Sequence, residues 1–283
     1  MARIAHLSDV HFGAHDPQLV AAAEAWLVEN RPDLVAISGD FTQRARVAQY
    51  REAGAFLDRL EAAGLETLGV PGNHDVPLYD VIRRFVRPLH RYRRYIDDDL
   101  CPWFESERLA VLGINTARSL TFKDGRIDRE QMALIRERFR DVPEQRTRVL
   151  VTHHPLFAMP IGEEGGLTKV VGRHQDALAA VADAGVHLLL AGHFHRSFSG
   201  SARAMVKNAG PALVIQAGTA TSTRLRAGEA QSFNLLTAHA NDAVDLQVIE
   251  WDGAAFAGRD HARFGFDGEQ WQPRPAPSPT AAG

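Results

Sequence analysis

Cysteine is nearly absent from this chain, in which Cys101 is the only one among 283 residues. A single thiol cannot form an intramolecular disulfide, so nothing in the sequence requires an oxidising compartment. No histidine stands beside Cys101 to act as its base, and a buried spectator thiol is therefore a better interpretation than a nucleophile.

Long hydrophobic runs are missing as well. No window reaches the roughly 18 uninterrupted apolar residues that a membrane-spanning helix needs. The opening MARIAHLSDVHF contains neither a long apolar run nor a cleavage site of small residues, so we expect no signal peptide. We therefore predict a cytoplasmic protein.

An excess of positive charge is the third absence. The formal net charge is -3, with 45% hydrophobic and 24% charged residues, which is ordinary for a soluble globular protein. Such a balance offers no general basic surface, and we do not expect nucleic acid to be a partner. The length suits one large domain or two small ones, and either can bury a sizeable core. No linker in the sequence divides the chain into independent domains.

What the sequence does contain is an alternation of strand and helix patterns. Apolar strands are predicted at 2–9, 33–40 and 66–75, with amphipathic helices at 16–30 and 47–64 between them. Asp16 is a plausible N-cap followed by Pro17, and Gly64 ends the second helix. This order predicts parallel strands joined by right-handed crossovers. Further strands at 108–116, 147–154 and 187–195 enclose helices at 128–141 and 172–185, and a β-rich stretch follows residue 195.

Two segments depart from this rhythm. Residues 78–104 are basic, aromatic and predicted to be helical, with an interruption at Pro88. The arginines of this segment have three possible roles. They either cover apolar surface from the solvent side or form a cap that receives an anionic substrate. The third alternative is contact with a membrane surface through 83–95. Residues 271–283 are rich in proline, alanine and serine, and we expect a disordered tail after a single domain at 1–270.

Polar side chains gather where the apolar strands end. Ligands in open α/β sheets bind outside the carboxyl ends of the strands, so five such ends can converge on one place. Residues two apart on an extended segment face the same side, and each such pair can therefore hold one ion or two neighbouring ions. DVH and GD are weak motifs alone and GNHD is moderately specific, but the joint occurrence of the motifs at five strand ends is an improbable accident. The residues are Asp9, His11, Asp40, Asn73, His74, Asp75, His153, His154, His193 and His195.

The chemistry of these side chains predicts a metal centre. Imidazole and carboxylate without thiolate suit Zn²⁺, Mn²⁺ or Fe. The set is larger than one tetrahedral ion requires and is about right for two ions that share an aspartate. Two adjacent metals are the usual device for in-line phosphoryl displacement.

The ordered motifs DVH, GD, GNHD, HHP and GHFH resemble those of the calcineurin-like metallophosphoesterases. The stretches LSDVHFG, GDFTQRAR, PGNHDVP and THHPL are most similar to bacterial members near the class III cyclic-nucleotide phosphodiesterases. The resemblance implies an α/β fold, namely a four-layer α/β/β/α sandwich with two mixed β-sheets. We expect the β-rich stretch after residue 195 to belong to the second sheet.

The resemblance also implies roles for individual residues. One metal would be held by Asp9, His11 and His195, and the other by Asn73, His153 and His193, with Asp40 bridging the two. His154 would lie outside the ligand set. His74 would face the substrate and protonate the leaving oxygen or stabilise the transition state. Asp75 would either orient His74 or cap a loop.

These roles describe a dinuclear metal-dependent phosphohydrolase that uses two Mn, Fe or Zn ions. The favoured activity is a phosphodiesterase that acts on a small anionic phosphoester by attack of a metal-bound hydroxide. The alternatives are hydrolysis of a pyrophosphate-linked lipid precursor, a phosphomonoester or a nucleic-acid end, and a non-enzymatic binding scaffold. Because the residues at all the expected ligand positions are intact, the scaffold is the weakest of these. A homodimer is a further expectation.

Overall fold

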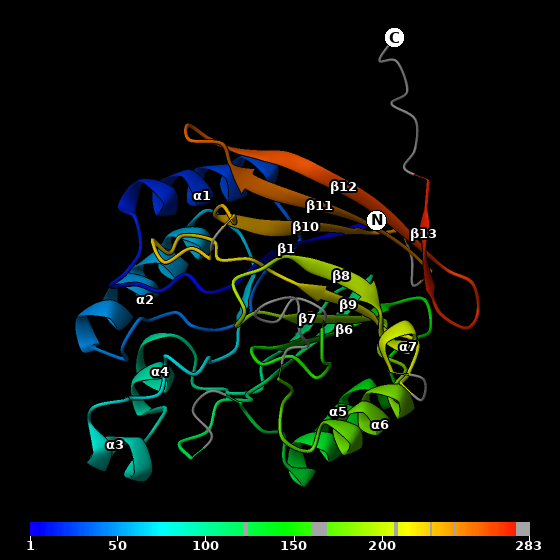
Figure 1. Ribbon diagram of the computed structural model, residues 1–283, viewed down its shortest axis with the longest axis horizontal. Coiled ribbons are helices and arrows are strands. Elements are labelled where there is room, and N and C mark those ends of the chain that lie inside the picture. Colours follow the sequence, from blue (N-terminus) through cyan, green and yellow to red (C-terminus); the bar gives the residue numbers. More distant parts are fainter. Residues whose placement is uncertain (121–123, 160–168, 207–208, 227, 240–241, 276–283) are drawn as a thin grey trace.

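The computed structural model describes residues 1–120, 124–159, 169–206, 209–226, 228–239 and 242–275. Two β-sheets lie face to face in the middle of the molecule, with helices outside them (Figure 1). One sheet has seven strands in the order β13-β12-β11-β10-β1-β2-β3, and the other has six in the order β4-β5-β6-β7-β9-β8. No helix within the described ranges has the length and apolar character needed to cross a bilayer.

The strands and helices have the following bounds. The seven-stranded sheet contains β1 (Ala2–Leu7), β2 (Leu34–Ile37), β3 (Thr67–Gly69), β10 (Ser232–Ala238), β11 (Ala243–Trp251), β12 (Phe256–Phe266) and β13 (Trp271–Arg274). The six-stranded sheet contains β4 (Trp103–Glu105), β5 (Leu109–Ile114), β6 (Thr147–Thr152), β7 (Leu188–Ala191), β8 (Phe198–Ser201) and β9 (Leu213–Gln216). The helices are α1 (Pro17–Asn30), α2 (Val47–Ala62), α3 (Val81–Val86), α4 (His90–Tyr95), α5 (Arg129–Arg140), α6 (His174–Asp183) and α7 (Ala202–Met205).

Three apolar layers hold the sheets and helices together. Ile4 and Leu34 of the first sheet pack between the sheets against Val149 and Leu188 of the second. The alternate residues of the same strands face outward and pack beneath α1 and α2, and α5 and α6 cover the outer face of the second sheet. Because strands in this position are buried on both faces, they appear in the sequence as continuous apolar runs. The predicted four-layer α/β/β/α sandwich with two mixed β-sheets is confirmed.

Local signals at the ends of helices act as the sequence predicts. The Asp16 carboxylate accepts a hydrogen bond of 2.8 Å from the backbone N–H of Gln18 at the start of α1. Gly64 follows α2 with a φ of +78°, a conformation that glycine adopts without steric cost. The β1–β2 and β2–β3 pairs are parallel, as the alternating pattern predicts.

The position of the C-terminal strands differs from the expectation. Only β8 and β9 join the second sheet after residue 195. The next four strands instead extend the first sheet, because β10 pairs antiparallel with β1, with Ala5 opposite Leu235. The expectation that the whole stretch joins the second sheet is therefore wrong for β10–β13.

Two other sequence assignments also need correction. Within 78–104 the structure has two short helices, α3 and α4, on either side of Pro88, but Trp103–Glu105 forms strand β4 at the edge of the second sheet. The predicted disordered tail at 271–283 begins too early, because Trp271–Arg274 pairs with β12 and the Trp271 side chain is buried. Residues 276–283 lie outside the described part of the chain.

Candidate metal centre

Five strand ends from both sheets meet at one point. Strands β1, β2 and β3 lead into Asp9, Asp40 and Asn73, while β6 and β7 of the other sheet lead into His153 and His193. All five side chains belong to segments that leave the carboxyl ends of parallel strands. The structure therefore brings together the seven residues that the resemblance implies as ligands.

The first group consists of Asp9, His11 and His195. The Oδ1 atom of Asp9 lies 3.1 Å from Nε2 of His195 and 3.5 Å from Nε2 of His11. The two Nε2 atoms lie 3.2 Å apart. All three ligand atoms thus point at a common position.

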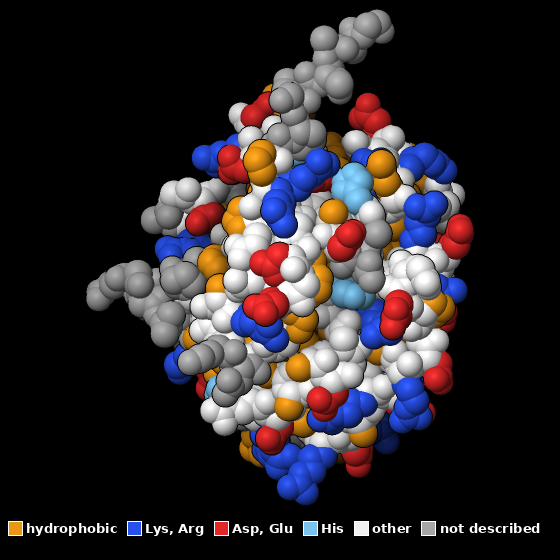
Figure 2. Space-filling view, turned by 90° about the vertical axis from the view of Figure 1, so that its right-hand side faces the viewer, with side chains coloured by type: hydrophobic (Ala, Val, Ile, Leu, Met, Phe, Trp, Pro, Cys, Tyr) orange, Lys and Arg blue, Asp and Glu red, His pale blue; other side chains and the backbone are white. Residues whose placement is uncertain are grey.

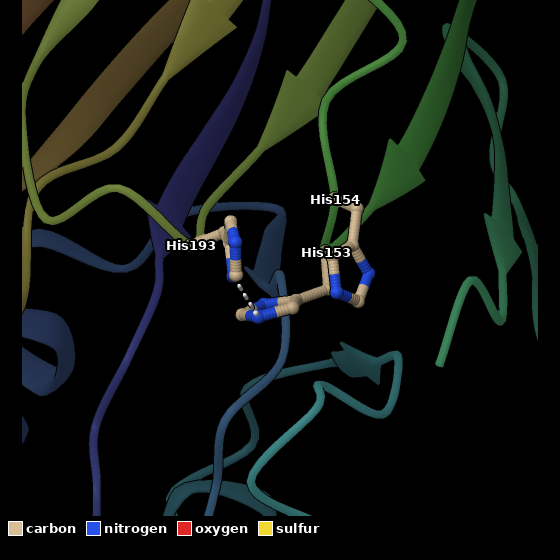
Figure 3. A group of neighbouring side chains, drawn as sticks. All are labelled: His153, His154 and His193. Carbon is tan, nitrogen blue, oxygen red and sulfur yellow. Dashed lines mark hydrogen bonds between the residues drawn. The ribbon is translucent and has the colours of Figure 1, made fainter. Parts of the chain in front are cut away.

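The second group consists of Asn73, His153 and His193. Oδ1 of Asn73 lies 3.0 Å from Nε2 of His153 and 3.0 Å from Nδ1 of His193. The two imidazole nitrogens lie 3.3 Å apart, and Figure 3 shows the rings pointing toward each other from the ends of β6 and β7.

Asp40 connects the two groups. Its Oδ2 atom lies 3.7 Å from Nε2 of His11 and 3.4 Å from Nε2 of His153. Its Oδ1 atom accepts a hydrogen bond of 2.8 Å from the backbone N–H of His74. This carboxylate can therefore bridge two adjacent cations.

The spacing and protonation of these atoms suit metal ions. Bonds of 2.0–2.2 Å to one ion place neighbouring ligand atoms about 3.0–3.4 Å apart, which is close to the separations found here. Asp9 Oδ1 has no hydrogen-bond donor among the described residues, whereas Oδ2 accepts from the Ser8 hydroxyl and the His193 N–H. His153 donates its Nδ1–H to the Ser38 carbonyl, 2.7 Å away, which leaves the Nε2 lone pair for an ion.

Burial and nearby charge set the protonation of the centre. Burial acts to raise the pKa of Asp9, but His195 and His11 outweigh it and hold that pKa well below its usual range. Burial and the neighbouring His153 lower the pKa of His193 to about 4, and burial also lowers the pKa of His11. Near neutral pH the carboxylate is therefore ionised and these imidazoles are neutral, which are the forms that bind metal.

The backbone at the site is strained. Five of the eight non-glycine residues with positive φ in the described chain are predicted ligands, with values between 48° and 81°. Each such conformation costs on the order of 1 kcal/mol and persists only where the surrounding structure enforces it. Concentration of strain at one place marks a functional site. The five residues are Asp9, His11, Asp40, His193 and His195.

Glycines next to the ligands allow the strand ends to approach closely. A Cβ at Gly72 would lie 2.1 Å from Oδ1 of Asp40, and one at Gly192 would lie 1.8 Å from the Ser8 hydroxyl oxygen. Gly39, which precedes Asp40, has a φ of +92°, a backbone conformation that glycine adopts without steric cost.

The remaining predicted site residues occupy different environments. His154 is buried beside His193, and its Nδ1 lies 2.8 Å from the Thr116 hydroxyl. Figure 3 shows its ring on a different side of the strand end from the His153 ring. His74 is partly exposed, lies against His11, and donates its Nδ1–H to the Gln43 carbonyl at 2.8 Å.

Asp75 is placed as a loop-positioning residue. Its carboxylate is fully buried and accepts hydrogen bonds from the backbone N–H groups of Phe41, Thr42 and Gly72 and from the Thr42 hydroxyl. Burial and the charge of Asp40 raise its pKa to about 7, and the bonds from Gly72 and Thr42 act in the opposite direction. This geometry joins the loops that carry Asp40 and Asn73, and it fits the loop-capping alternative better than contact with substrate.

Several positioning residues escape sequence reasoning. The hydroxyls of Thr219 and Thr221 donate to the backbone carbonyls of Asp9 and Val10, each at 2.7 Å. Ser8 and Ser38 support Asp9 and His153 as described above. No local motif marks the two threonines, because they meet the first loop only after the chain has returned to it more than two hundred residues later.

The sequence profile of the calcineurin-like phosphoesterases matches residues 2–197. The chain belongs to this family. The match covers all seven predicted ligands, which we call the strand-end centre: Asp9, His11, Asp40, Asn73, His153, His193 and His195. No curated protein matches the sequence significantly.

Solved structures of other phosphoesterases share the fold. A purple acid phosphatase from yellow lupin (Lupinus luteus) seeds has a TM-score of 0.72 at 14% identity, with 94% of this chain and 54% of that one covered. A dimetal phosphatase from Danio rerio has a TM-score of 0.62 at 13% identity, covering 94% of this chain and 99% of that one. A putative 5'-nucleotidase from Staphylococcus aureus has a TM-score of 0.51 at 14% identity, covering 99% of this chain and 55% of that one. This phosphoesterase therefore spans about half the length of the lupin enzyme.

Proposed function

We propose that this phosphoesterase is a dinuclear metal-dependent phosphodiesterase. The proposal depends on one observation. Two groups of three residues each bring their ligand atoms to within 3.5 Å of one another, and Asp40 lies between the groups. Asp9, His11 and His195 would hold one ion, and Asn73, His153 and His193 the other. Two ions bound there would stabilise charge on the phosphoryl oxygens and lower the pKa of a water molecule.

His74 is the proposed acid beside the metals. Its Nδ1–H is committed to the Gln43 carbonyl, so this contact fixes the plane of the ring next to His11. The ring is partly exposed, and in its imidazolium form Nε2 would also carry a proton, which it would donate as a hydrogen bond or transfer to the leaving oxygen of a bound ester. Asp75 would hold the loop on which His74 lies.

Preference for a diester is supported by the resemblance of the first motifs to class III cyclic-nucleotide phosphodiesterases. A small anionic diester is the proposed substrate, and Mn, Fe or Zn ions are the proposed metals. The cytoplasm is the proposed location, because the single cysteine cannot form an intramolecular disulfide and the sequence therefore does not require an oxidising compartment.

Hydrolysis of bis-p-nitrophenyl phosphate and p-nitrophenyl phosphate, metal-free and with added Mn²⁺, tests the proposal. We expect metal-dependent cleavage of the diester, which Asp40→Ala should reduce by more than about 100-fold because it removes a ligand of both ions. Preference for the monoester would instead favour a phosphatase. Metal binding without turnover of either ester would favour a selective substrate such as a lipid pyrophosphate. A protein that binds no metal under any condition would contradict the proposal.

A further inference from the structure

An unusual number of apolar side chains face solvent around α3. Nine large hydrophobic residues in the described chain are exposed, and six of them lie between residues 78 and 86. Leu120, 85% exposed, belongs to the loop that α3 contacts. We call these residues the α3 face. They are Leu78, Tyr79, Val81, Ile82, Phe85, Val86 and Leu120, with Ile82 the most exposed within the helix at 79%.

The helix is held with its polar side toward the protein. The Arg84 guanidinium donates to the Ser119 carbonyl at 2.8 Å through Nε, and the Ser119 hydroxyl donates to the Arg84 carbonyl at 2.5 Å. Arg83 pairs with Asp80, the N-cap residue of the same helix, at 2.9 Å. Both arginines are half-buried, whereas the apolar residues around them are exposed. Helices of globular proteins normally turn their apolar side inward, so α3 has the reverse orientation. Defined contacts enforce that orientation.

The α3 face lies beside the strand-end centre. Val81 follows Asn73 by eight residues, a distance of at most about 28 Å along the chain. The Arg44 guanidinium lies 5.2 Å from the centre of the Tyr79 ring, and Arg44 directly follows Gln43, which contacts His74. An apolar pocket of about 410 Å³ next to this face is lined by residues that include Val76, Arg87, Pro88, Ala117 and Ser119.

The charge around this face selects its partner. Residues 78–99 contain six arginines and four aspartates, an excess of positive charge, although the whole chain has a net charge of -3. Within the described part of the chain, Arg87 is exposed and has no ion pair. The side of the molecule away from α3 shows Lys and Arg interspersed with Asp and Glu, and its apolar side chains are scattered (Figure 2).

A second copy of the chain fits this face poorly. A symmetric dimer through it would bring the same arginines of two copies together, because a two-fold interface uses the same patch on both sides. Anionic lipid headgroups complement those charges, and the acyl boundary below them accepts the apolar side chains. The combination is typical of an interfacial helix.

We propose that the α3 face docks this protein on an anionic lipid surface. Ile82, Phe85 and Val86 enter the headgroup region while Arg87 contacts lipid phosphates. Docking at this face keeps the strand-end centre close to the bilayer. The docking surface is shorter than the segment 83–95 that the sequence suggests, because Leu89 and Tyr92 of its second half are buried in the core.

Sedimentation of the full-length protein with vesicles tests this proposal. We expect co-sedimentation with vesicles of phosphatidylcholine mixed with phosphatidylglycerol, and much less with phosphatidylcholine alone or at high salt. The double variant Ile82→Glu and Phe85→Glu should lower the bound fraction by about tenfold or more, because each removes a buried apolar contact. Arg87→Glu should also weaken binding.

Ala254→Glu is a control on the exposed hairpin between β11 and β12, far from α3 in Figure 1. It adds a negative charge and should leave vesicle binding unchanged. The α3 variants should cleave a soluble diester like the wild type, so failure to dock is distinguishable from failure of the proposed activity. Equal binding by the double variant and the wild type would overturn the proposal. So would an absence of vesicle binding by the wild type. A dimer, seen by light scattering, that the double variant dissociates would then assign the α3 face to a second copy of the chain.

Discussion

The strand-end centre and the α3 face break the usual rule of burial in opposite ways. The centre buries two carboxylates and several imidazoles among apolar strands, and the α3 face exposes aliphatic and aromatic side chains to solvent. Buried ionisable groups and an exposed apolar patch both indicate a binding site. Burial of a charged group costs free energy unless a partner compensates, and so does exposure of apolar surface to water. The difference suggests two kinds of partner, which are cations at the centre and an amphipathic anionic surface at α3.

The two regions also differ in how firmly the fold holds them. Asp9 is fixed by its neighbour Ser8 and by His193 and Thr219, so two distant segments of the chain also help to preorganise the centre. The helix α3 has no buried residue and is attached mainly through Arg84 and Ser119. A metal site requires such rigidity, whereas a surface that meets lipid does not.

Replacing His153 should have the largest effect, and replacing the adjacent His154 should have a much smaller one. If both variants kept their metal and activity, the strand-end centre would not be a metal site and its contrast with the α3 face would be lost. We expect His153→Ala to lose bound metal and more than about 100-fold in diester turnover, since even residues that support metal ligands are worth 10–100-fold. His154→Ala should keep both ions and lose about tenfold or less. Elemental analysis and turnover measure this difference. If His154→Ala lost an ion and His153→Ala did not, His154 would be the metal ligand and the assignment of His153 would be wrong.

Stability measurements should separate α4 from α3. Tyr92 is fully buried and lies edge-to-face with Phe41, so Tyr92→Ala should lower the free energy of unfolding by about 3–5 kcal/mol. Ile82→Glu should change it by less than about 0.5 kcal/mol because the side chain is exposed. Urea unfolding provides both values.

Tyr92→Phe is the matched control for this pair. The Tyr92 hydroxyl has no hydrogen-bond partner among the described residues, so its removal should be nearly neutral. If Ile82→Glu were as damaging as Tyr92→Ala, the α3 face would be part of the core and its assignment as an exposed surface would be wrong.

The smallest expected effect concerns the close contact between Gly72 and Asp40. Gly72→Ala should lower the free energy of unfolding by about 1–3 kcal/mol and reduce turnover, because the added methyl group would displace the bridging carboxylate. Gly172→Ala is the control, since its new Cβ would lie 3.5 Å from the nearest atom. Equal results for the two variants in thermal unfolding and diester turnover would show that the centre tolerates displacement.

Much of the fold and nearly all of the centre could be predicted from the sequence. The ligands follow apolar strands directly, so local order along the chain places them at strand ends. The caps of α1 and α2 are equally local, and Asp16 and Gly64 act as their sequence context suggests. Family resemblance assigned Asp40 to the bridging position, and the distances to His11 and His153 are compatible with it.

Other features depend on contacts that no local pattern encodes. Strand β10 pairs with β1 and not with the second sheet. In this pairing Ala5 lies opposite Leu235, a residue near the other end of the sequence. The support of Asp9 by Thr219 has the same non-local origin. The reversed orientation of α3 depends on Ser119, a residue in a distant loop, and residue composition alone leaves the direction of the arginines open.

By itself, the sequence determined which side chains can form the centre and which strands are buried on both faces, since both follow from residue type and short-range order. Only the tertiary structure decided how those side chains divide into two groups. Asn73 meets His193 and His11 meets His195 from segments more than a hundred residues apart, and such contacts exist only after two sheets have packed together. The exposure of Ile82 and Phe85 was decided in the same way, because burial is a property of the packed molecule.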